Sequence, residues 1–521
     1  SAKTMLSARI AASCAESPTA RQSASEKARS AARFGFDALI LDISNDSIVD
    51  AFMAPGFNLR TDNWGGSYEN RFRLAQMIVS RVREAIGPDF VLELRVSATL
   101  GVPETYPFEE MLQFLKSVED QIDIVNLVTG MDEYHDGNVK LCPPIFEPHL
   151  LNLERARAIR ESCDVLVNIS GAIMDVQEAE RVLREGAADL VLLGRSLVAD
   201  PFWPKKVLEG REDDIVPCIR CNNCYHIATE HFNTCCTVNP RVYRENRVPL
   251  TLPRAQTARS VVVVGGGPAG LKAALTAAQR GHQVTLVEQS GALGGLMIPA
   301  SVGAFKEDLR RYLSYLRRQV EKSQIHVMLH TRADRALLEH LHPDAVILAV
   351  GGRAVMPPVP GLGTSGAVQA VALLNAGLET AGTRVTILGG GSIGCELALE
   401  LAALDRMVTV VELRDKLAAN GNELYRQDLM LHLEQETRIT ILTQTVCTGV
   451  TAQGCTVREK DGGTRVIPHD TFVIAAGLRA DADAVEALYG VVPETYYVGD
   501  CKRAASITEA TTEAYFLGAS L

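Results

Sequence analysis

The sequence predicts an α/β protein in three parts: a (β/α)8-type barrel that lacks its N-terminal strands, an iron–sulfur segment rich in cysteine, and two nested Rossmann-like domains. Two observations predict this architecture. Apolar strands alternate with helix-like stretches through the first 215 residues, which is the pattern of parallel βα units. Two glycine-rich turns, each placed between a strand and a helix, follow in the second half of the chain.

The first region contains five candidate strands, each followed by a loop and a helix-like stretch. A complete barrel needs eight strands and about 250 residues, and residues 1–24 cannot supply three more. Three explanations stay open: the strands lie outside this sequence, a partner chain or a second copy completes the barrel, or the barrel is degenerate and has lost FMN. The strands are expected at 37–42, 90–96, 122–128, 165–169 and 189–193.

The ends of these strands carry residues suited to a flavin. Gly171 in NISGAI, and Gly194 and Arg195 in LLGRSLVADP, follow the last two strands, where barrels bind phosphate. Arg95 ends the strand FVLELRV, where its cation would stabilise the anionic reduced ring of FMN. An inward ion pair is the alternative role for Arg95. Because all four residues remain, we favour the explanation in which the missing strands lie outside this sequence.

The motif SVVVVGGGPAGLKAAL opens the first Rossmann-like unit. Gly265, Gly267 and Gly270 allow the tight turn, the approach of a pyrophosphate, and close packing of helix on strand. Glu288 ends the next strand, QVTLVE, where an acid binds the hydroxyls of a ribose. A bare glycine motif is a weak signal, but two flanking strands and the acid make it specific. We expect FAD here.

The motif RVTILGGGSIGCELALELAAL opens a second unit inside the first. Gly389, Gly391 and Gly394 repeat the arrangement, and Glu412 ends the strand MVTVVE. An acid at this position favours NADH because it repels the 2′-phosphate of NADPH. Arg414 weakens that preference, so NADPH stays open, as does a vestigial site. The expected domains are 1–215 (barrel with FMN and substrate), 216–257 (iron–sulfur segment and linker), 258–365 with 471–521 (FAD), and 366–470 (NAD(P)H).

Five of the twelve cysteines are clustered between the barrel and the first Rossmann-like unit. Cys218, Cys221 and Cys224 follow C-x2-C-x2-C, and either Cys235 or Cys236 supplies a fourth thiolate. Such a pattern holds an iron–sulfur cluster or zinc. Three close thiolates and one distant thiolate favour a cubane 4Fe-4S cluster over zinc. Unpaired metal-binding cysteines indicate a reducing compartment, hence the cytoplasm.

The totals of the sequence exclude other classes of function. The chain has 521 residues, a formal net charge of −11 and 47% apolar residues, enough for a large core. An acidic surface repels nucleic acid and anionic membrane, so we expect neither as a partner. No apolar run is long enough to span a membrane. We interpret the Ala-, Ser- and Arg-rich residues 1–33 as a surface helix rather than a transit peptide.

Over residues 25–521 the sequence resembles the old yellow enzyme family in its long multidomain form, which includes 2,4-dienoyl-CoA reductase, enoate reductases and trimethylamine dehydrogenase. RTDNWGGSYENR (60–71) matches the most specific signature of that family. GRSLVADPFWPKKVLEG, running into the cysteine motif, is nearly as specific. In the family the fourth cluster ligand precedes a segment like TVNPR, which selects Cys236. YYVGDC matches the segment in which Gly499 and Asp500 would hold the ribitol of FAD.

The resemblance also implies a route for electrons. NADH reduces FAD by hydride transfer, FAD passes single electrons to the 4Fe-4S cluster, and the cluster passes them to FMN. FMN then reduces an activated C=C bond in a small-molecule substrate. A flavin is needed between NADH and the cluster, because NADH gives up two electrons as a hydride whereas the cluster accepts one electron at a time.

The sequence departs from the family in LDISNDSIVDAFMAP. Asp42 and Asn45 stand where the family has two histidines, and Ser47 stands where it has a tyrosine acid. Asn45 can still donate a hydrogen bond to a substrate carbonyl, whereas Asp42 has the wrong charge and Ser47 is a poor acid. Tyr134 and His135, in TGMDEYHDG, are the candidate replacement donors. Alternatively, both residues face solvent in a loop and have no catalytic role.

Three functions are therefore carried forward. The first is an NADH-dependent flavin and iron–sulfur reductase of an enoyl or enone C=C bond. The second is an amine dehydrogenase-like enzyme, suggested by the cysteine spacing, although an intact second Rossmann-like unit argues for reduction by NADH. The third is an electron-transfer subunit with a degenerate barrel site, suggested by the altered segment around Asn45.

Overall fold

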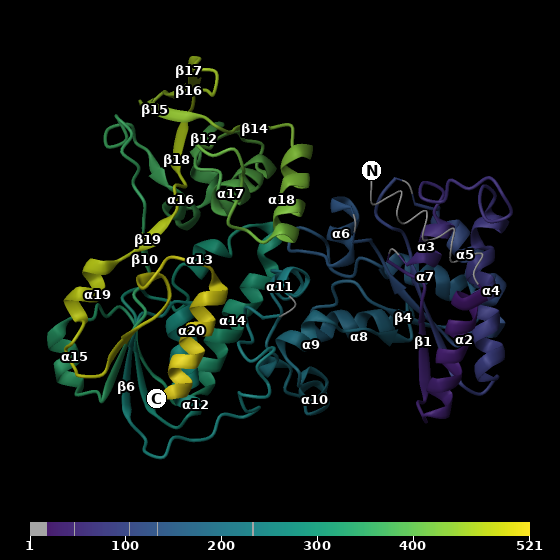
Figure 1. Cartoon of the computed structure of the whole chain (residues 1–521). Helices are drawn as coiled ribbons and strands as arrows, with labels where there is room; N and C mark the ends of the chain where they lie inside the picture. The colour runs from purple at the N-terminus through teal and green to yellow at the C-terminus, as the bar shows by residue number, and fades with distance from the viewer. Residues whose placement is uncertain (1–17, 46, 104, 133, 232–233) are drawn as a thin grey trace. The chain divides into compact units, whose positions relative to one another are not determined.

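The computed structural model describes residues 18–521 except 46, 104, 133, 232 and 233, and gives only the backbone of residues 18–23, 135, 230 and 231 (Figure 1). The chain divides into two compact units, Ser1–Ser196 and Leu197–Leu521. Among the described residues, no helix combines the length and the apolar character that crossing a membrane requires.

The first unit is built on a parallel sheet whose five strands follow their order in the sequence, β1-β2-β3-β4-β5. All five coincide within a few residues with the strands expected from the sequence, so the prediction of repeated βα units is confirmed. Parallel neighbours need crossover connections, and helices supply them here. The strands are β1 Ala38–Asp42, β2 Val91–Ser97, β3 Ile124–Val128, β4 Leu166–Ile169 and β5 Leu190–Val191.

Several helices of the first unit bury an apolar stripe. In α5, Met111, Phe114, Leu115 and Val118 recur at helical spacing and are buried. The described part of the predicted N-terminal helix is α2, which packs against α4 (Figure 1). The helices are α2 Pro18–Arg33, α3 Ile48–Met53, α4 Tyr68–Ile86, α5 Phe108–Val118, α6 His135–Leu141, α7 Leu153–Ser162, α8 Val176–Arg184 and α9 Arg195–Ala199.

The two faces of the first sheet differ in chemistry. Leu92, Leu94 and Val96 of β2 are fully buried. Glu93 and Arg95 alternate with them and therefore point to the opposite face, where they are partly exposed. That opposite face carries the polar residues of the first candidate site.

The second unit contains an outer sheet of parallel strands in the order β20-β9-β6-β7-β8. Val262 and Val263 of β6 point to opposite faces of the sheet and are 1% and 0% exposed, as expected for a strand covered on both faces. Helix α12 packs against α20 (Figure 1). The elements are β6 Ser260–Val264, α12 Pro268–Gln279, β7 Gln283–Val287, α13 Met297–Ala300, α14 Glu307–Lys322, β8 His326–Met328, α15 Arg335–Leu341, β9 Ala345–Leu348, α19 Ala482–Leu488, β20 Thr495–Tyr497 and α20 Ile507–Ser520.

An inner domain repeats this plan with the strand order β11-β18-β12-β13-β14, beside a three-stranded antiparallel sheet, β15-β16-β17. A two-stranded ladder of β10 and β19 pairs the segments that run between the domains. The elements are β10 Gly352–Ala354, β11 Val368–Gln369, α16 Ala370–Ala376, β12 Arg384–Leu388, α17 Ser392–Ala403, β13 Met407–Val411, α18 Glu423–Gln435, β14 Ile439–Leu442, β15 Val446–Val450, β16 Gly454–Arg458, β17 Thr464–Pro468, β18 Thr471–Ile474 and β19 Leu478–Ala480.

One boundary differs from that expected. The sequence assigns 471–521 to the outer domain, whereas β18 pairs with β12 of the inner sheet through Val385 and Thr471. The return to the outer sheet comes with β20. A short apolar run does not specify its partner strand, so TFVI fits either sheet.

Candidate functional site

A row of polar side chains crosses the non-helical face of the first sheet. Arg95 is the register partner of Asp42 on one side and of Asn126 on the other. Its Nη1 lies 3.8 Å from Asp42 Oδ2, so the ion pair considered for Arg95 is present, though loose. Asp42 Oδ1 also accepts hydrogen bonds from the backbone N and the Oγ of Ser44, at 3.0 and 2.6 Å. The charge of Asp42 is therefore partly balanced within the row.

Three buried atoms in this row have no protein partner. Glu93 Oε1 accepts hydrogen bonds from Asn126 Nδ2 at 2.6 Å and from Asn168 Nδ2 at 2.9 Å. The Oδ1 atoms of both asparagines and Nε of Arg95 remain unsatisfied. Buried polar atoms of this kind are costly unless a ligand or water pairs with them. One donor and two acceptors in a row fit the edge of a flavin ring, which also presents donors and acceptors.

Sequence reasoning found Arg95 but missed Glu93, Asn126 and Asn168. Their signal is a polar residue in the middle of an otherwise apolar strand, as in IDIVNLV and VLVNI. Such a residue must face a partner or a ligand, because the strand itself is buried.

The predicted phosphate site lies at the carboxyl ends of β4 and β5. Gly171 has a φ of +114°, and a Cβ there would lie 3.0 Å from Nδ2 of Asn152. Gly194 has open space around its missing Cβ. Arg195 donates from Nη1 to the backbone oxygen of Pro143 at 2.7 Å. Backbone exposed at two glycines can approach a phosphate closely, so these residues fit that group.

Asn45 is held in the left-handed region, with a φ of 48°, which asparagine tolerates better than most residues. Its backbone N–H donates to Ser97 Oγ at 2.9 Å, and Ser97 Oγ lies 2.7 Å from Asp50 Oδ2. Tyr106 OH donates to Asp50 Oδ1 at 2.7 Å. Burial and then the neighbouring Asp50 carboxylate raise the pKa of Tyr106 well above its usual value. This hydrogen-bonded network fixes the loop that presents Asn45.

The other candidate proton donors lie in two loops. Ser47 Oγ accepts from the backbone N of Asp50 at 3.1 Å and so caps α3. Tyr134 precedes α6, is 36% exposed, and has its ring centroid 5.7 Å from that of Phe57. The side chain of His135 lies outside the described part of the structure. Tyr134 is thus an exposed residue, whereas Ser47 is engaged as a helix cap.

The first glycine-rich turn has the geometry of a pyrophosphate cradle. At Gly265, where φ is +106°, a Cβ would lie 2.3 Å from a backbone oxygen; at Gly270 it would lie 1.8 Å from Gly265 O. Gly267 is the N-cap of α12, so the helix N-terminus opens onto the turn. Glu288 Oε2 accepts from the backbone N of Gly266 at 2.7 Å.

The second turn repeats this geometry closely. At Gly389, where φ is +115°, a Cβ would lie 2.4 Å from a backbone oxygen; at Gly394 it would lie 2.0 Å from Gly389 O. Gly391 is the N-cap of α17. Glu412 Oε2 accepts from the backbone N of Gly390 at 2.6 Å. Both cradles therefore retain the backbone shape that a dinucleotide requires.

Gly499 and Asp500 lie next to the first cradle. Gly499 has a φ of +73°, and a Cβ there would lie 2.8 Å from Cβ of Ala269 in the first turn of α12. Asp500 Oδ1 accepts from the backbone N of Ala505 at 3.2 Å, and burial raises the pKa of Asp500. The structure thus brings this pair, far away in sequence, to the end of the first glycine-rich turn.

The cysteine segment packs into the core of the second unit. Cys236 is 9% exposed and belongs to the core beneath α12, and Cys218 and Cys221 pack against that core. Cys224 and Cys235 are half-buried. Burial, with a smaller contribution from Cys221, raises the pKa of Cys236 to about 11. Cys236 rather than Cys235 therefore belongs to the core against which Cys218 and Cys221 pack.

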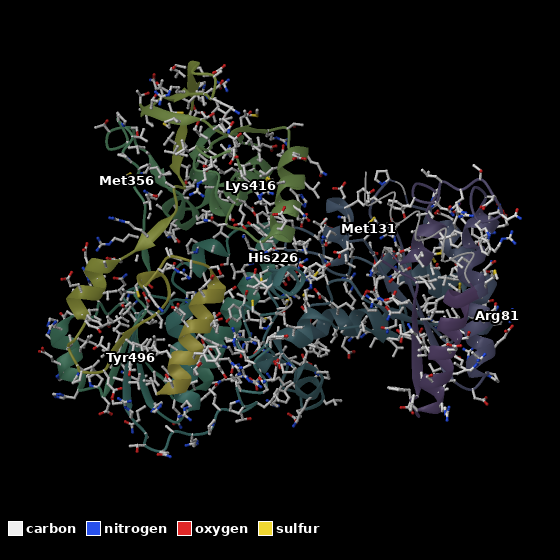
Figure 2. The ribbon with its side chains drawn as sticks, in the orientation of Figure 1. Arg81, Met131, His226, Met356, Lys416 and Tyr496 are labelled. Atoms are coloured by element: carbon white, nitrogen blue, oxygen red, sulfur yellow. The ribbon has the colours of Figure 1, made fainter. Side chains whose placement is uncertain are left out.

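Local backbone in this segment is shaped around sulfur. Arg220 and Asn222 have positive φ angles of 45° and 58°, and the backbone N of Arg220 donates to Cys218 Sγ at 3.4 Å. Helix α11 (Asn223–His231) follows and carries His226, labelled in Figure 2. An amide directed at a sulfur fits a thiolate that carries charge.

The spacing of the sulfurs is wide. Within the described part of the chain, no three cysteine sulfurs lie within 4.8 Å of one another. A single tetrahedral zinc, with Zn–S bonds of about 2.3 Å, would hold its sulfurs roughly 3.8 Å apart. Among the described cysteines, the sulfurs are thus not drawn together as they would be around one zinc ion.

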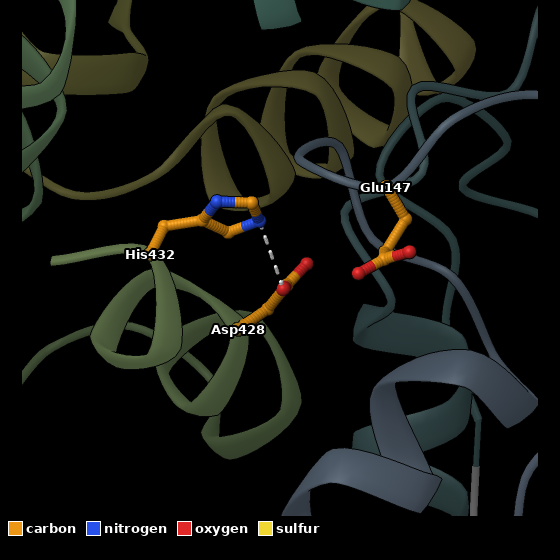
Figure 3. Close-up of side chains that lie close together, drawn as sticks. All are labelled: Glu147, Asp428 and His432. Carbon is orange, nitrogen blue, oxygen red and sulfur yellow. Dashed lines mark ion pairs between the residues drawn. The ribbon is translucent and has the colours of Figure 1, made fainter. Parts of the chain in front are cut away.

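Helix α18 carries a polar pair that the sequence did not indicate. His432 Nε2 lies 3.5 Å from Asp428 Oδ1 one turn away (Figure 3). The figure also draws Glu147, which belongs to the first compact unit. The pair is an i,i+4 interaction of the inner domain.

Comparison with known proteins matches both units. Residues 19–214 match the NADH:flavin oxidoreductase / NADH oxidase family, and residues 259–513 match the pyridine nucleotide-disulphide oxidoreductase model. An NADH oxidase of Thermoanaerobacter brockii is 34% identical over 450 residues, which cover 85% of this chain and 68% of the relative. A cinnamate reductase of Clostridium sporogenes is 28% identical over 506 residues, covering 94% and 75%. A structure of 2-naphthoyl-CoA reductase with 2-naphthoyl-CoA has a TM-score of 0.90 and 26% identity, covering 97% and 77%.

Proposed function

Because the chain belongs to the NADH:flavin oxidoreductase / NADH oxidase family, and is an NADH-dependent flavin oxidoreductase, we propose that it reduces an activated C=C bond of enoyl or enone type. Electrons pass from NADH through FAD and a 4Fe-4S cluster to FMN, and from FMN to the substrate. Cinnamate, the substrate in the name of one relative, is an unsaturated carboxylate of this class.

The observation that carries the proposal is the grouping of three sites in one compact unit. Both glycine cradles and the four cysteines lie within Leu197–Leu521. Cys236 shares a hydrophobic core with Val261 and Val263 of the strand that leads into the first cradle. This shared core supports a cluster close to FAD. FAD is the group that would convert a hydride into single electrons. Cys218, Cys221, Cys224 and Cys236 would hold the cluster.

The first unit supplies the residues for FMN and substrate. Arg95, with its unsatisfied Nε, would stand at the flavin ring, and Gly171, Gly194 and Arg195 would hold the phosphate. Asn45 would donate a hydrogen bond to the substrate carbonyl. Bound FMN supplies the hydride for the C=C bond.

Tyr134 would supply the proton that completes reduction. Tyr134 is exposed, while Ser47, the residue at the family's acid position, is occupied as the cap of α3. An anaerobic enzyme with Tyr134→Phe should still be bleached by NADH but should reduce an enoate at least tenfold more slowly. Unchanged enoate turnover in this variant would assign the proton to another group.

The cofactor content of the purified protein tests the proposal directly. We expect one FAD, one FMN and four irons per chain, measured under anaerobic conditions. Two neighbouring cysteines offer a matched pair: Cys236→Ser should lose iron, whereas Cys235→Ser should keep four irons. Zinc in place of iron, or FAD and iron without FMN, would contradict the reductase assignment.

Anaerobic titration then separates this function from its alternatives. NADH should bleach the flavins, and cinnamate should reoxidise them. Bleaching by an amine in the absence of NADH would instead indicate the amine dehydrogenase-like function. We infer from the proposed metal-binding thiolates that the protein acts in the reducing cytoplasm.

A further inference from the structure

A chain of side-chain hydrogen bonds joins the inner domain to one of the cysteines. Asn422, the N-cap of α18, contacts Asn223 at the start of α11. Asn223 contacts Thr508 in the first turn of α20 and also Thr237. Thr237 in turn contacts the sulfur of Cys221. The chain therefore connects three parts of the second unit that are far apart in the sequence.

A backbone amide fixes the direction of the chain. The N–H of Tyr425 donates to Asn422 Oδ1 at 3.0 Å, so Nδ2 of Asn422 must face the other way. It donates to the backbone oxygen of Cys221 at 2.7 Å and to Asn223 Oδ1 at 2.9 Å. Because Asn223 Oδ1 is the acceptor there, the NH2 group of Asn223 faces the two threonines.

The threonines then have defined roles. Asn223 Nδ2 donates to Thr508 Oγ1 at 2.7 Å and to Thr237 Oγ1 at 3.2 Å. The two hydroxyl oxygens lie 2.7 Å apart, and Thr237 Oγ1 lies 3.1 Å from Cys221 Sγ. A metal-bound thiolate accepts hydrogen bonds and donates none. With Cys221 ligated, the Thr237 hydroxyl must therefore donate to the sulfur, and Thr508 donates to Thr237.

We propose that Thr237 sets the reduction potential of the cluster through this hydrogen bond, and that Asn422 of the inner domain is the positioning residue that fixes its direction. The inference rests on the proposed function, since it needs a cluster at Cys221. A donor at a ligand sulfur stabilises the more negative, reduced cluster, so it raises the potential. Thr237 is 2% exposed, so water does not screen the hydrogen bond from its hydroxyl.

The contact also makes the potential responsive to the inner domain. Asn422 belongs to the domain that we expect to bind NADH, while Thr237 and Asn223 belong to the cysteine segment. Movement of α18 away from Asn223 would release the amide of Asn223 and weaken the donor at Cys221. Cluster reduction would then be most favourable when the inner domain is docked.

The test is an EPR-monitored redox titration of the holoenzyme. Thr237→Val keeps the shape of the side chain but removes the hydroxyl, and we expect a potential lower by the equivalent of about tenfold in the equilibrium of reduction, or about 59 mV for one electron. Thr237→Ser keeps the donor and serves as the matched control, with a potential like that of the wild type.

A second variant tests the positioning residue. Asn422→Ser retains an N-cap for α18 but cannot reach Asn223, so we expect a smaller shift in the same direction. Iron content should stay at the wild-type level in all three variants. Thr237→Val should melt a few degrees lower than the wild type, because the buried donors of Asn223 and Thr508 lose an acceptor. A cluster whose potential is the same in Thr237→Val as in Thr237→Ser would overturn this inference alone. A wild-type protein without four irons would overturn it together with the proposed function.

Discussion

The two glycine cradles have almost the same backbone geometry but different surroundings. In each, a glutamate accepts a hydrogen bond from the middle glycine, at 2.7 Å for Glu288 and 2.6 Å for Glu412. Around the first cradle, Glu288 is 7% exposed and Ala269 is 6% exposed. At the place in α17 that corresponds to Ala269, Ile393 is 38% exposed, and Glu412 is half-buried.

The difference comes from segments outside the βαβ units. At Gly295, a Cβ would lie 2.9 Å from Cα of Gly267, and Gly499 packs on Ala269, so two turns close over the first cradle. Around Gly391 no atom lies within 4 Å of an added Cβ. An enclosed cradle suits a cofactor that stays bound, and an open one suits a substrate that must enter and leave. The enclosure of the first cradle and the openness of the second therefore support FAD at the first and NADH at the second.

The largest effect should come from adding one methyl group in each cradle. Gly267 and Gly391 have extended backbones with φ of −75° and −68°, which alanine adopts without strain. Gly267→Ala should yield protein without FAD, because the methyl occupies the space of the pyrophosphate. Gly391→Ala should keep FAD but raise the KM for NADH at least tenfold. FAD per chain after desalting and steady-state kinetics measure the two outcomes.

Melting temperature controls for damage to the fold. Replacing glycine by alanine where the backbone permits it stabilises a protein by about 0.4–1 kcal/mol. With cofactors removed from all three proteins, neither variant should therefore have a lower melting temperature than the wild type. Loss of FAD from Gly391→Ala together with its retention in Gly267→Ala would reverse our assignment of the two cradles.

Exchanging each glutamate for glutamine should produce a smaller, selective effect. Glu412 accepts hydrogen bonds from the backbone N of Gly390 and of Arg414, and its charge would repel a 2′-phosphate. Glu412→Gln should shift the ratio of kcat/KM for NADPH to that for NADH by about tenfold, or about 1.4 kcal/mol. Glu288→Gln is the matched change in the other cradle and should weaken FAD retention without altering that ratio. A changed nucleotide preference in Glu288→Gln would show that the cradles are not separate sites.

The parts of the molecule that depend on local sequence could be predicted. Five strands of the first sheet and both glycine turns follow from short-range patterns, and Gly265 and Gly389 indeed have the positive φ that their motifs require. The partner of β18 could not be predicted, because pairing of Thr471 with Val385 joins residues far apart in the chain.

In the candidate site, too, local sequence patterns predict some features and miss others. Cys218, Cys221 and Cys224 are recognisable from their spacing alone. The chain from Asn422 to Thr237 is not, because it exists only where α11, α18 and α20 meet. Polar residues whose partners lie hundreds of positions away carry no local pattern, so only the folded structure reveals their hydrogen bonds.

The smallest effect should come from ion pairs at the edges of the two domains. Arg384 Nη2 lies 2.7 Å from Asp470 Oδ1, and Arg259 Nη2 lies 2.7 Å from Glu494 Oε2. The hydrogen bond from Arg384 lowers the pKa of Asp470 to about 2, and that from Arg259 lowers the pKa of Glu494. The pKa of each carboxyl is lower in the folded than in the unfolded protein. Each ion pair therefore stabilises the folded state above the unfolded pKa, and this stabilisation is lost as the pH falls through the folded pKa.

Asp470→Asn and Glu494→Gln should each lower the melting temperature at pH 7 by about 2 °C at most, because exposed pairs are screened by water. The difference in melting temperature between Asp470→Asn and the wild type should narrow as the pH falls from 5 to 3. Protonation of Asp470 in the unfolded state then removes the stability that its charged form gains from Arg384. Calorimetry at pH 7, 5 and 3 measures it. A gap that widens toward pH 3 would mean that Asp470 is not stabilised by Arg384, and that the inner domain holds its edge by other contacts.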